Sequence, residues 1–156
     1  RGVKANLARK PQGNDRAQVK AVYQGECDVS LGNTYYMGHM MTNEKSPEQK
    51  DWAAAVNVIF PNQGDRGTHV NISGAGITKS AKNKANAVKL IEFLSGNAAQ
   101  KIYAEDNFEY PVKAGVKVHP IVAGWGKFKA EETLLSKIAE HRTQATRIMD
   151  KVRFDN

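Results

Sequence analysis

The chain has 156 residues, 40% hydrophobic and 25% charged, which is enough for one ordinary globular domain with its own core. Its formal net charge of +7 would favour anionic ligands, but the basic residues are dispersed and do not alternate with aromatic residues, which disfavours a nucleic-acid-binding surface. The single cysteine, Cys27, excludes an intramolecular disulfide and a cysteine-based zinc site.

The first part of the chain predicts helices around one short strand. Residues 1–9 resemble the interior of an amphipathic helix, as if a longer polypeptide preceded them, and a loop with Pro and Gly follows. Asp15 precedes a second helix over residues 16–24. Residues 27–31 predict a short buried strand, and residues 34–41 predict a helix or helical turn.

The middle of the chain predicts two strands and three helix starts. Ser46-Pro47-Glu48 is typical of a helix start, with Pro at the first position. Strand signals follow at residues 68–72 and 75–78, after a polar turn. Apolar residues at helical spacing then predict helices over residues 85–94 and 98–105.

The last part of the chain predicts a connection and a long helix. Residues 107–115 predict a loop or short strand. Residues 116–129 contain Pro120 and two glycines around Trp125, which argues against regular structure. Residues 134–152 carry the clearest amphipathic stripe in the chain. Helices that alternate with short strands indicate the α/β class.

Two adjacent tyrosines, Tyr35 and Tyr36, stand at the start of the helix predicted over residues 34–41. Successive side chains on a helix diverge by about 100°, so one interpretation is that one ring packs and the other is half exposed. The other interpretation is that both hydroxyls reach a single hard cation at the mouth of a cleft. Residues alone leave both open.

A trivalent cation would favour the phenolate form of tyrosine, whose unperturbed pKa is about 10. Phenolate oxygen is a hard anion and suits Fe(III) better than soft metals. Two phenolates leave the coordination shell incomplete, so other groups or an exogenous anion must complete it. Asn33 can donate its amide to such an anion or act as an N-cap, and the free N–H groups of the helix start lie beside it.

Catalytic motifs are missing from the sequence. There is no phosphate-binding Gly-rich fingerprint, no Gly-x-Ser-x-Gly segment and no His-Glu-x-x-His pair. The four histidines lie far apart in sequence, and no acid–base pair can be nominated. The sequence therefore predicts a protein that is not an enzyme.

Residues 25–36 (GECDVSLGNTYY) resemble a segment of the periplasmic ferric-ion-binding proteins, the solute-binding subunits of bacterial ABC iron(III) transporters. The likeness continues through 60–76 (FPNQGDRGTHVNISGAG), 87–95 (AVKLIEFLS), 109–112 (EYPV) and 125–129 (WGKFK). It covers nearly the whole chain. Proteins of that family are about twice as long, so the resemblance implies that this chain corresponds to their C-terminal half.

The resemblance implies part of a two-lobed periplasmic-binding-protein fold of type II, with a hinge and an inter-lobe cleft. Residues 1–56 would belong mainly to the second lobe, and residues 57–69 would cross the hinge. Residues 70–112 would return to the first lobe. Residues 113–156 would form a connection and a C-terminal helix in the second lobe.

The resemblance also implies a ligand set. Tyr35 and Tyr36 match the family's iron ligands, and Asn33 matches a position that contacts a synergistic anion, carbonate or phosphate. Arg66, in a Gly-Asp-Arg-Gly turn, is either a surface partner of Asp65 or a cation that holds an anion near the cleft. Further ligands would lie in the N-terminal half.

The function implied is binding of Fe(III) in the cleft and delivery to an ABC permease in the inner membrane. The protein would be periplasmic, monomeric when intact, and paired with its own N-terminal half. Two alternatives are a solute-binding protein for a polyamine, thiamine or organic anion, and a basic nucleic-acid-binding module. Colour on addition of ferric salt separates iron from an aromatic box that binds an organic cation through ring faces.

Overall fold

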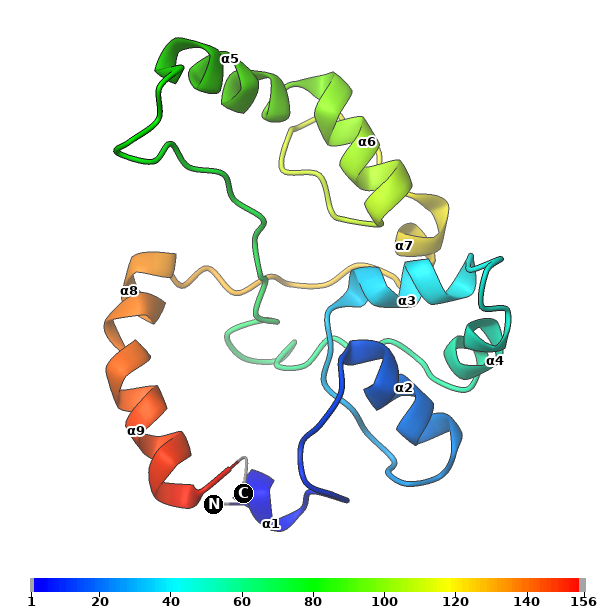
Figure 1. Cartoon of the computed structure of the whole chain (residues 1–156). Helices are drawn as coiled ribbons and strands as arrows, with labels where there is room; N and C mark the ends of the chain where they lie inside the picture. The colour runs from blue at the N-terminus through cyan, green and yellow to red at the C-terminus, as the bar shows by residue number, and fades with distance from the viewer. Residues whose placement is uncertain (1, 155–156) are drawn as a thin grey trace.

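The computed structural model describes residues 2–154. The helices of this part of the chain are α1 (Gly2–Ala5), α2 (Asp15–Tyr23), α3 (Thr34–Met41), α4 (Glu48–Ala54), α5 (Lys84–Leu94), α6 (Asn97–Asn107), α7 (Pro120–Gly124), α8 (Leu135–Glu140) and α9 (Arg142–Val152). Figure 1 shows α2, α3 and α4 grouped together, α5 and α6 as an arm, and α8 and α9 on the opposite side from α4.

A small apolar core holds α2, α3 and α4 together. Val19 from α2, Met37 and Met40 from α3 and Ala53 from α4 are buried in one cluster, and Met40 is fully inaccessible. Trp52 and Trp125 pack against its edge. Helical spacing places these residues on facing stripes, so burying them fixes the position of α3.

A second buried group joins α3 to α6 and α7. Phe108 is buried next to α6, and Gly38 of α3 lies directly against its ring. A Cβ atom on Gly38 would lie 2.2 Å from Cγ of Phe108, so only glycine permits this approach. The Phe108 ring also makes edge contacts with His39 and His119, at 5.2 and 4.7 Å between centroids. These contacts seat the side of α3 opposite the first core.

The predicted strands are wrong for the described residues. Residues 27–31, 68–72 and 75–78 form no strand ladder, and residues 2–154 contain only one isolated parallel bridge, between Thr68 and Ala130. The sequence signals are real, but a strand needs a neighbouring strand to accept and donate its backbone hydrogen bonds. No described segment runs beside residues 27–31 or 75–78 in that way.

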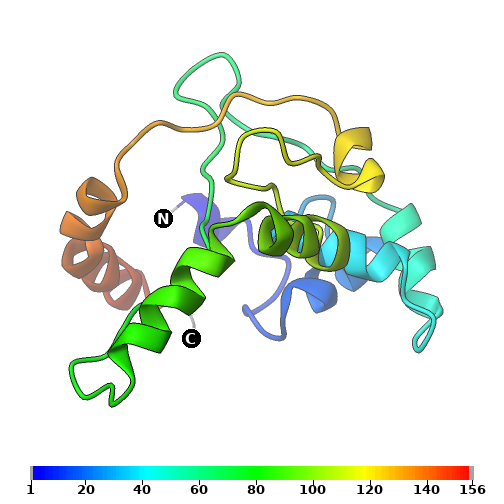
Figure 2. The same cartoon turned by 90° about the horizontal axis from the view of Figure 1, so that it is seen from above.

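The bridge joins the two extended connections of the chain. The Thr68 N–H donates to the carbonyl of Lys129 at 2.8 Å, and the Glu131 N–H donates to the carbonyl of Thr68 at 2.8 Å. Gln63 adds side-chain bonds to the Lys129 backbone in both directions. Phe60 and Phe128 stack at 4.3 Å beside them. Figure 2 shows these connections crossing between the helical groups.

Most predicted helices are confirmed, with three corrections. The helix over 34–41 has those bounds, and those near 16–24, 48, 85–94 and 98–105 differ by a few residues. The first helix stops at Ala5 instead of continuing to residue 9. The connection over 116–129, expected to lack regular structure, contains α7, because Pro120 suits a first helical turn and His119 accepts from the Ile121 N–H. The helix over 134–152 breaks at His141 into α8 and α9.

Asn14 is the N-cap of α2, and its side chain accepts a hydrogen bond from the Ala17 N–H at 3.1 Å. Asn14→Ala should therefore lower the free energy of unfolding by about 1 kcal/mol. Asn83, the N-cap of α5, makes no such bond and provides the matched control, since Asn83→Ala should cost less. Chemical denaturation of both variants measures the difference. Equal losses would contradict a capping role for Asn14.

Candidate metal centre

The tyrosine pair lies in the first turn of α3, which both buried clusters hold in place. The rings of Tyr35 and Tyr36 are 4.3 Å apart between centroids and tilted by 31°, and both side chains are half-buried. The structure therefore places the two rings side by side instead of directing one into a core and the other to solvent.

The surroundings of Tyr35 keep its proton in place in the iron-free protein. The hydrogen bond with Tyr36 raises the pKa of Tyr35 to about 12, with partial burial as the next cause. The electrostatic effects of Tyr36, Asp15 and Glu109 raise the pKa further. The negative charges of the two carboxylates would attract a cation bound at the pair.

Asn33 was expected to bind an anion or to cap the helix, and in this structure it donates to a carboxylate of the chain. It occupies the N-cap position of α3 but forms no side-chain capping bond. Its backbone N–H and its side-chain Nδ2 both donate to Oδ2 of Asp15, at 2.7 and 3.1 Å. Asp15 is the first residue of α2. A carboxylate of the chain itself therefore occupies these two donors at the start of α3.

Arg16 lies against the second tyrosine. Its Cζ atom is 5.0 Å from the centroid of the Tyr36 ring, the geometry of a cation–π contact. Its Nε atom is buried and has no hydrogen-bond partner. The guanidinium therefore holds the Tyr36 ring from the α2 side and places a positive charge next to the pair.

A polar chain runs from the other side of the pair. The His39 ring is edge-on to Tyr35 at 6.2 Å between centroids, and its Nε2 is 2.8 Å from Oδ1 of Asn107. The Asn107 amide donates to Glu109, which also accepts from the Ser73 hydroxyl at 3.1 Å. These bonds connect α3 to α6 and to the loop that follows it.

Arg66, the other residue expected to bind an anion, has a carboxylate partner. Its Nε is 3.4 Å from Oε1 of Glu131, and its side chain is 60% exposed. Glu131 also lies 3.3 Å from Nδ1 of His69. Arg66 thus belongs to the cluster of contacts around the Thr68–Ala130 bridge. Within residues 2–154 Arg66 makes no contact with the tyrosine pair, so the geometry does not bring the four expected site residues together.

The donors available near the pair are oxygens of phenols. In the part of the chain that the structure describes, no three side chains of His, Cys, Asp or Glu gather closely enough to hold a metal ion. Hard oxygen donors of this kind suit ferric iron.

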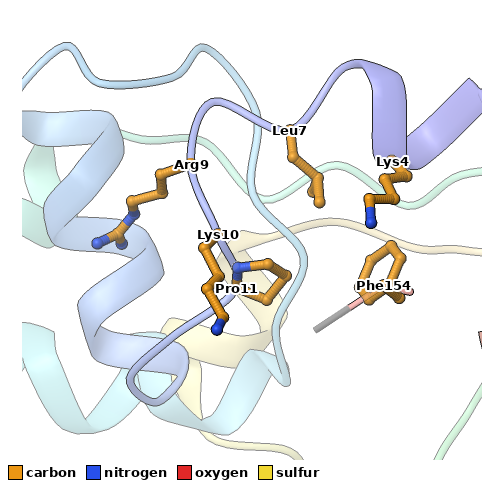
Figure 3. A pocket seen from close by; sticks show the side chains of 6 residues that line it. All are labelled: Lys4, Leu7, Arg9, Lys10, Pro11 and Phe154. Atoms are coloured by element: carbon orange, nitrogen blue, oxygen red, sulfur yellow. The ribbon is translucent and has the colours of Figure 1, made fainter. Parts of the chain in front are cut away.

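A cavity of about 310 Å³ lies elsewhere, where α1 meets the end of α9. Figure 3 shows its lining: Lys4, Leu7, Arg9, Lys10, Pro11 and Phe154. The Lys4 ammonium donates to the Val152 carbonyl at 2.8 Å, and Arg9 pairs with Glu26 at 3.2 Å. The lining contains no expected ligand and no acidic side chain, so this cavity does not suit a cation.

Sequence reasoning found the tyrosines but missed four of their neighbours. His39 had a usable signal, because it follows Tyr35 by four residues on a predicted helix and so shares its face. Asp15, Arg16 and Glu109 lie on other elements, far away in sequence. Their proximity depends on how α2 and the loop after α6 pack around α3, which no local pattern reveals.

The fold is that of a solute-binding protein. Residues 6–101 match the family model described as "Bacterial extracellular solute-binding protein", and the chain belongs to this family. The structure is similar to the apo ferric ion-binding protein A of Pasteurella haemolytica, with a TM-score of 0.94 and 55% identity over 99% of this chain and 48% of that one. The chain forms part of the two-lobed type II fold of such proteins.

Two further relatives are described in connection with iron. The chain is 50% identical to iron uptake protein A1 of Synechocystis, and the match covers 97% of this chain and 42% of that protein. A Trichodesmium protein, solved in complex with iron and citrate, shares 45% identity at a TM-score of 0.88, over 96% of this chain and 47% of that one. The chain spans about half the length of the proteins it matches.

None of the helices in residues 2–154 has the length and apolar content needed to cross a bilayer.

Proposed function

We propose that this chain contributes the Tyr35–Tyr36 pair to a ferric-iron site in an inter-lobe cleft, and that the whole protein binds and delivers iron and is not an enzyme. The observation that carries the proposal is the pairing of the two phenol rings at the start of α3, 4.3 Å apart between centroids. The iron-related relatives point to the same cargo.

The chemistry of the pair supports ferric iron over other solutes. Binding replaces the two phenolic protons by one cation, and the resulting phenolates are hard ligands. The carboxylates of Asp15 and Glu109, whose charges reach Tyr35, add to the attraction for a trivalent ion. A polyamine or thiamine would instead need the ring faces, and Arg16 already covers a face of Tyr36.

The remaining coordination positions would be filled from elsewhere. We place the further protein ligands in the polypeptide that supplies the other half of the fold. A synergistic anion, carbonate or phosphate, is the other candidate. In this structure Nε of Arg66 lies beside Glu131, and the Asn33 donors contact Asp15. The tyrosine pair does not depend on either choice.

The lobe assignment inferred from the resemblance is also part of the proposal. Residues 1–56 contain the α2–α4 core, and residues 70–112 contain the α5–α6 arm. The crossing segment 57–69 pairs with residues 129–131 through the Thr68 backbone, as expected for two hinge strands. The connection and C-terminal helices in 113–156 would complete the second lobe.

Exposed apolar residues mark the surface for the other half of the fold. The helices α5, α8 and α9 have no buried residue, and their apolar side chains Phe93, Leu135 and Ile148 are each about half exposed. Soluble proteins rarely leave such stripes open. We assign them to contacts with the N-terminal half of the same protein, which would be monomeric when intact. Its partner in transport would be an ABC permease in the inner membrane, with the protein in the periplasm.

The proposal is tested by adding ferric iron to the full-length protein, supplied as its complex with EDTA, a hexadentate chelator. A phenolate-to-iron charge-transfer colour should appear as the protein takes the metal. If the protein binds a polyamine or thiamine and shows no colour when ferric iron is added, its solute is an organic molecule and the iron proposal is wrong. Retention on a polyanion with a steep salt dependence would instead favour the nucleic-acid alternative.

The proposed ligands also predict that iron binding weakens in acid. The pKa of Tyr35 is about 12, above the usual value, so Tyr35 is protonated in the iron-free protein at neutral pH. Each phenol must then release a proton when iron binds, and the pair should contribute about two log units of affinity per pH unit. Competition against EDTA from pH 6 to 8 measures this slope. A pH-independent affinity, after correction for the chelator, would contradict phenolate ligation.

A further inference from the structure

The guanidinium of Arg16 lies on the face of the Tyr36 ring and not beside a carboxylate. Its Cζ atom is 5.0 Å from the ring centroid, and its buried Nε atom has no hydrogen-bond partner. Within residues 2–154 it forms no ion pair, whereas Arg66 pairs with Glu131. The ring is thus the contact that the structure gives to this charge.

The start of α2 is tied to the start of α3, which keeps the guanidinium over the ring. The residue before Arg16, Asp15, accepts hydrogen bonds from the backbone N–H and the side-chain amide of Asn33, at 2.7 and 3.1 Å. The Tyr36 ring also lies 4.3 Å from the Tyr35 ring between centroids. Its orientation is therefore limited by an aromatic neighbour on its own helix and by a cation on α2.

We propose that Arg16 is the positioning residue of Tyr36. It holds the ring in the orientation in which the hydroxyl oxygen meets iron, and its positive charge acts on the ring electrons of the iron-bound phenolate. Arg16 itself does not touch the metal. The inference rests on the proposed function, since it assigns a role beside the same site.

The physical basis is the interaction of a cation with an aromatic ring. A cation is attracted to the ring face, and the attraction is larger when the pair is partly desolvated, as it is for these two half-buried side chains. The negative charge of a phenolate spreads into its ring and strengthens the contact. A ring that is already held in place also loses less side-chain freedom when it binds its ligand.

The same contact should alter the colour of the iron complex. An iron ion bonded to the hydroxyl oxygen lies beyond the rim of the ring, whereas the guanidinium lies over its face. The positive charge therefore lowers the energy of the ring electrons more than that of the iron orbitals that receive them. Removal of the charge should move the phenolate-to-iron charge-transfer band to longer wavelength.

Arg16→Met is the decisive variant, because it removes the charge and keeps an unbranched apolar side chain. Arg16→Lys keeps a cation that can still lie over the ring. Lys20→Met is the matched control, since Lys20 lies one turn further along α2 with its Nζ atom 5.1 Å from the centroid of the Trp52 ring. It thus loses the same kind of contact on the same helix, away from the tyrosine pair.

The full-length variants are loaded with ferric iron, and their visible spectra and their affinities in competition with EDTA are measured. Arg16→Met should bind iron about tenfold more weakly or worse, the usual loss when a residue that orients a metal ligand is removed, and its band should move to longer wavelength. Arg16→Lys should restore the band and most of the affinity. Lys20→Met should match the unmodified protein in both. Denaturant unfolding of the iron-free proteins should show similar, small losses for Arg16→Met and Lys20→Met.

Three results would overturn the inference while leaving iron binding intact. The first is an Arg16→Met protein whose band or affinity equals that of the unmodified protein. The second is an Arg16→Lys protein that restores neither, because the charge would then not be what acts. The third is an equal change in Lys20→Met, which would make both contacts simple braces between helices. An unmodified protein that takes no ferric iron and shows no colour would instead refute the proposed function.

Discussion

Tyr36→Phe should remove most of the ferric affinity of the protein and its charge-transfer colour. The substitution deletes one phenol oxygen and leaves the ring, which keeps its 4.3 Å contact with Tyr35 and its contact with Arg16. Loss of a group outside the coordination shell typically costs 10- to 100-fold in metal affinity, so loss of a ligand should exceed about 100-fold. Tyr35→Phe should behave similarly. Visible absorption and competition with EDTA measure both effects.

Tyr23→Phe is the matched control for these variants. Tyr23 ends α2, is 49% exposed and has no contact with the pair, so its loss should leave affinity and colour unchanged. The circular dichroism of all three variants should match that of the unmodified protein. Full colour and affinity in Tyr36→Phe would contradict the assignment of Tyr36 as a ligand.

Gly38→Ala should destabilise the protein by about 1–3 kcal/mol, the usual cost of forcing extra volume into a packed core. Helix propensity alone would make alanine more stabilising than glycine by about 1 kcal/mol, so the destabilisation expected here is opposite in sign to the propensity effect. The reason is the Phe108 ring, whose Cγ would lie 2.2 Å from the new methyl group. Because Phe108 is buried, α3 or α6 must shift, and the tyrosine pair shifts with α3.

The control for this variant is Gly124→Ala in α7. A Cβ atom there meets nothing within 4 Å, so the substitution should be neutral or slightly stabilising. Denaturant unfolding compares the two variants, and ferric affinity of the folded Gly38→Ala protein should also fall. If both substitutions stabilise the protein, the packing of α3 against Phe108 described above is incorrect.

Helices were predictable from the sequence because their signals are local. The apolar stripes of α3 and α5 each lie within a dozen residues, and both helices have nearly the bounds expected. The break at His141 was not predictable from the apolar stripe, which continues from α8 into α9. The short α7 was not predicted because Pro and Gly usually indicate a turn or loop, although they allow a single turn of helix.

Strands failed because their formation is not local. Residues 68–72 have a strand composition, yet only Thr68 finds a partner, at Ala130. Residues 27–31, which were also expected to form a strand, find no pairing partner in the described part of the chain. A pattern reports what a segment is suited to, whereas pairing needs a second segment at the right place. Since the chain spans about half the length of its relatives, several such segments lack neighbours in residues 2–154.

The candidate site was half predictable. Adjacent tyrosines have oxygen chemistry that can be recognised without a structure, and the fold places their rings side by side. The Asn33 N–H donates to Asp15, eighteen residues away in sequence. Arg66 faces Glu131 instead, across a bridge that connects distant parts of the chain. Charge partners set by tertiary packing are what the sequence did not reveal.

The most direct test of the account is a crystal structure of the full-length protein grown with ferric iron. The account predicts one iron ion bonded directly to the hydroxyl oxygens of both Tyr35 and Tyr36. An iron ion bound elsewhere, with the two tyrosine oxygens turned away from it, would contradict the central claim.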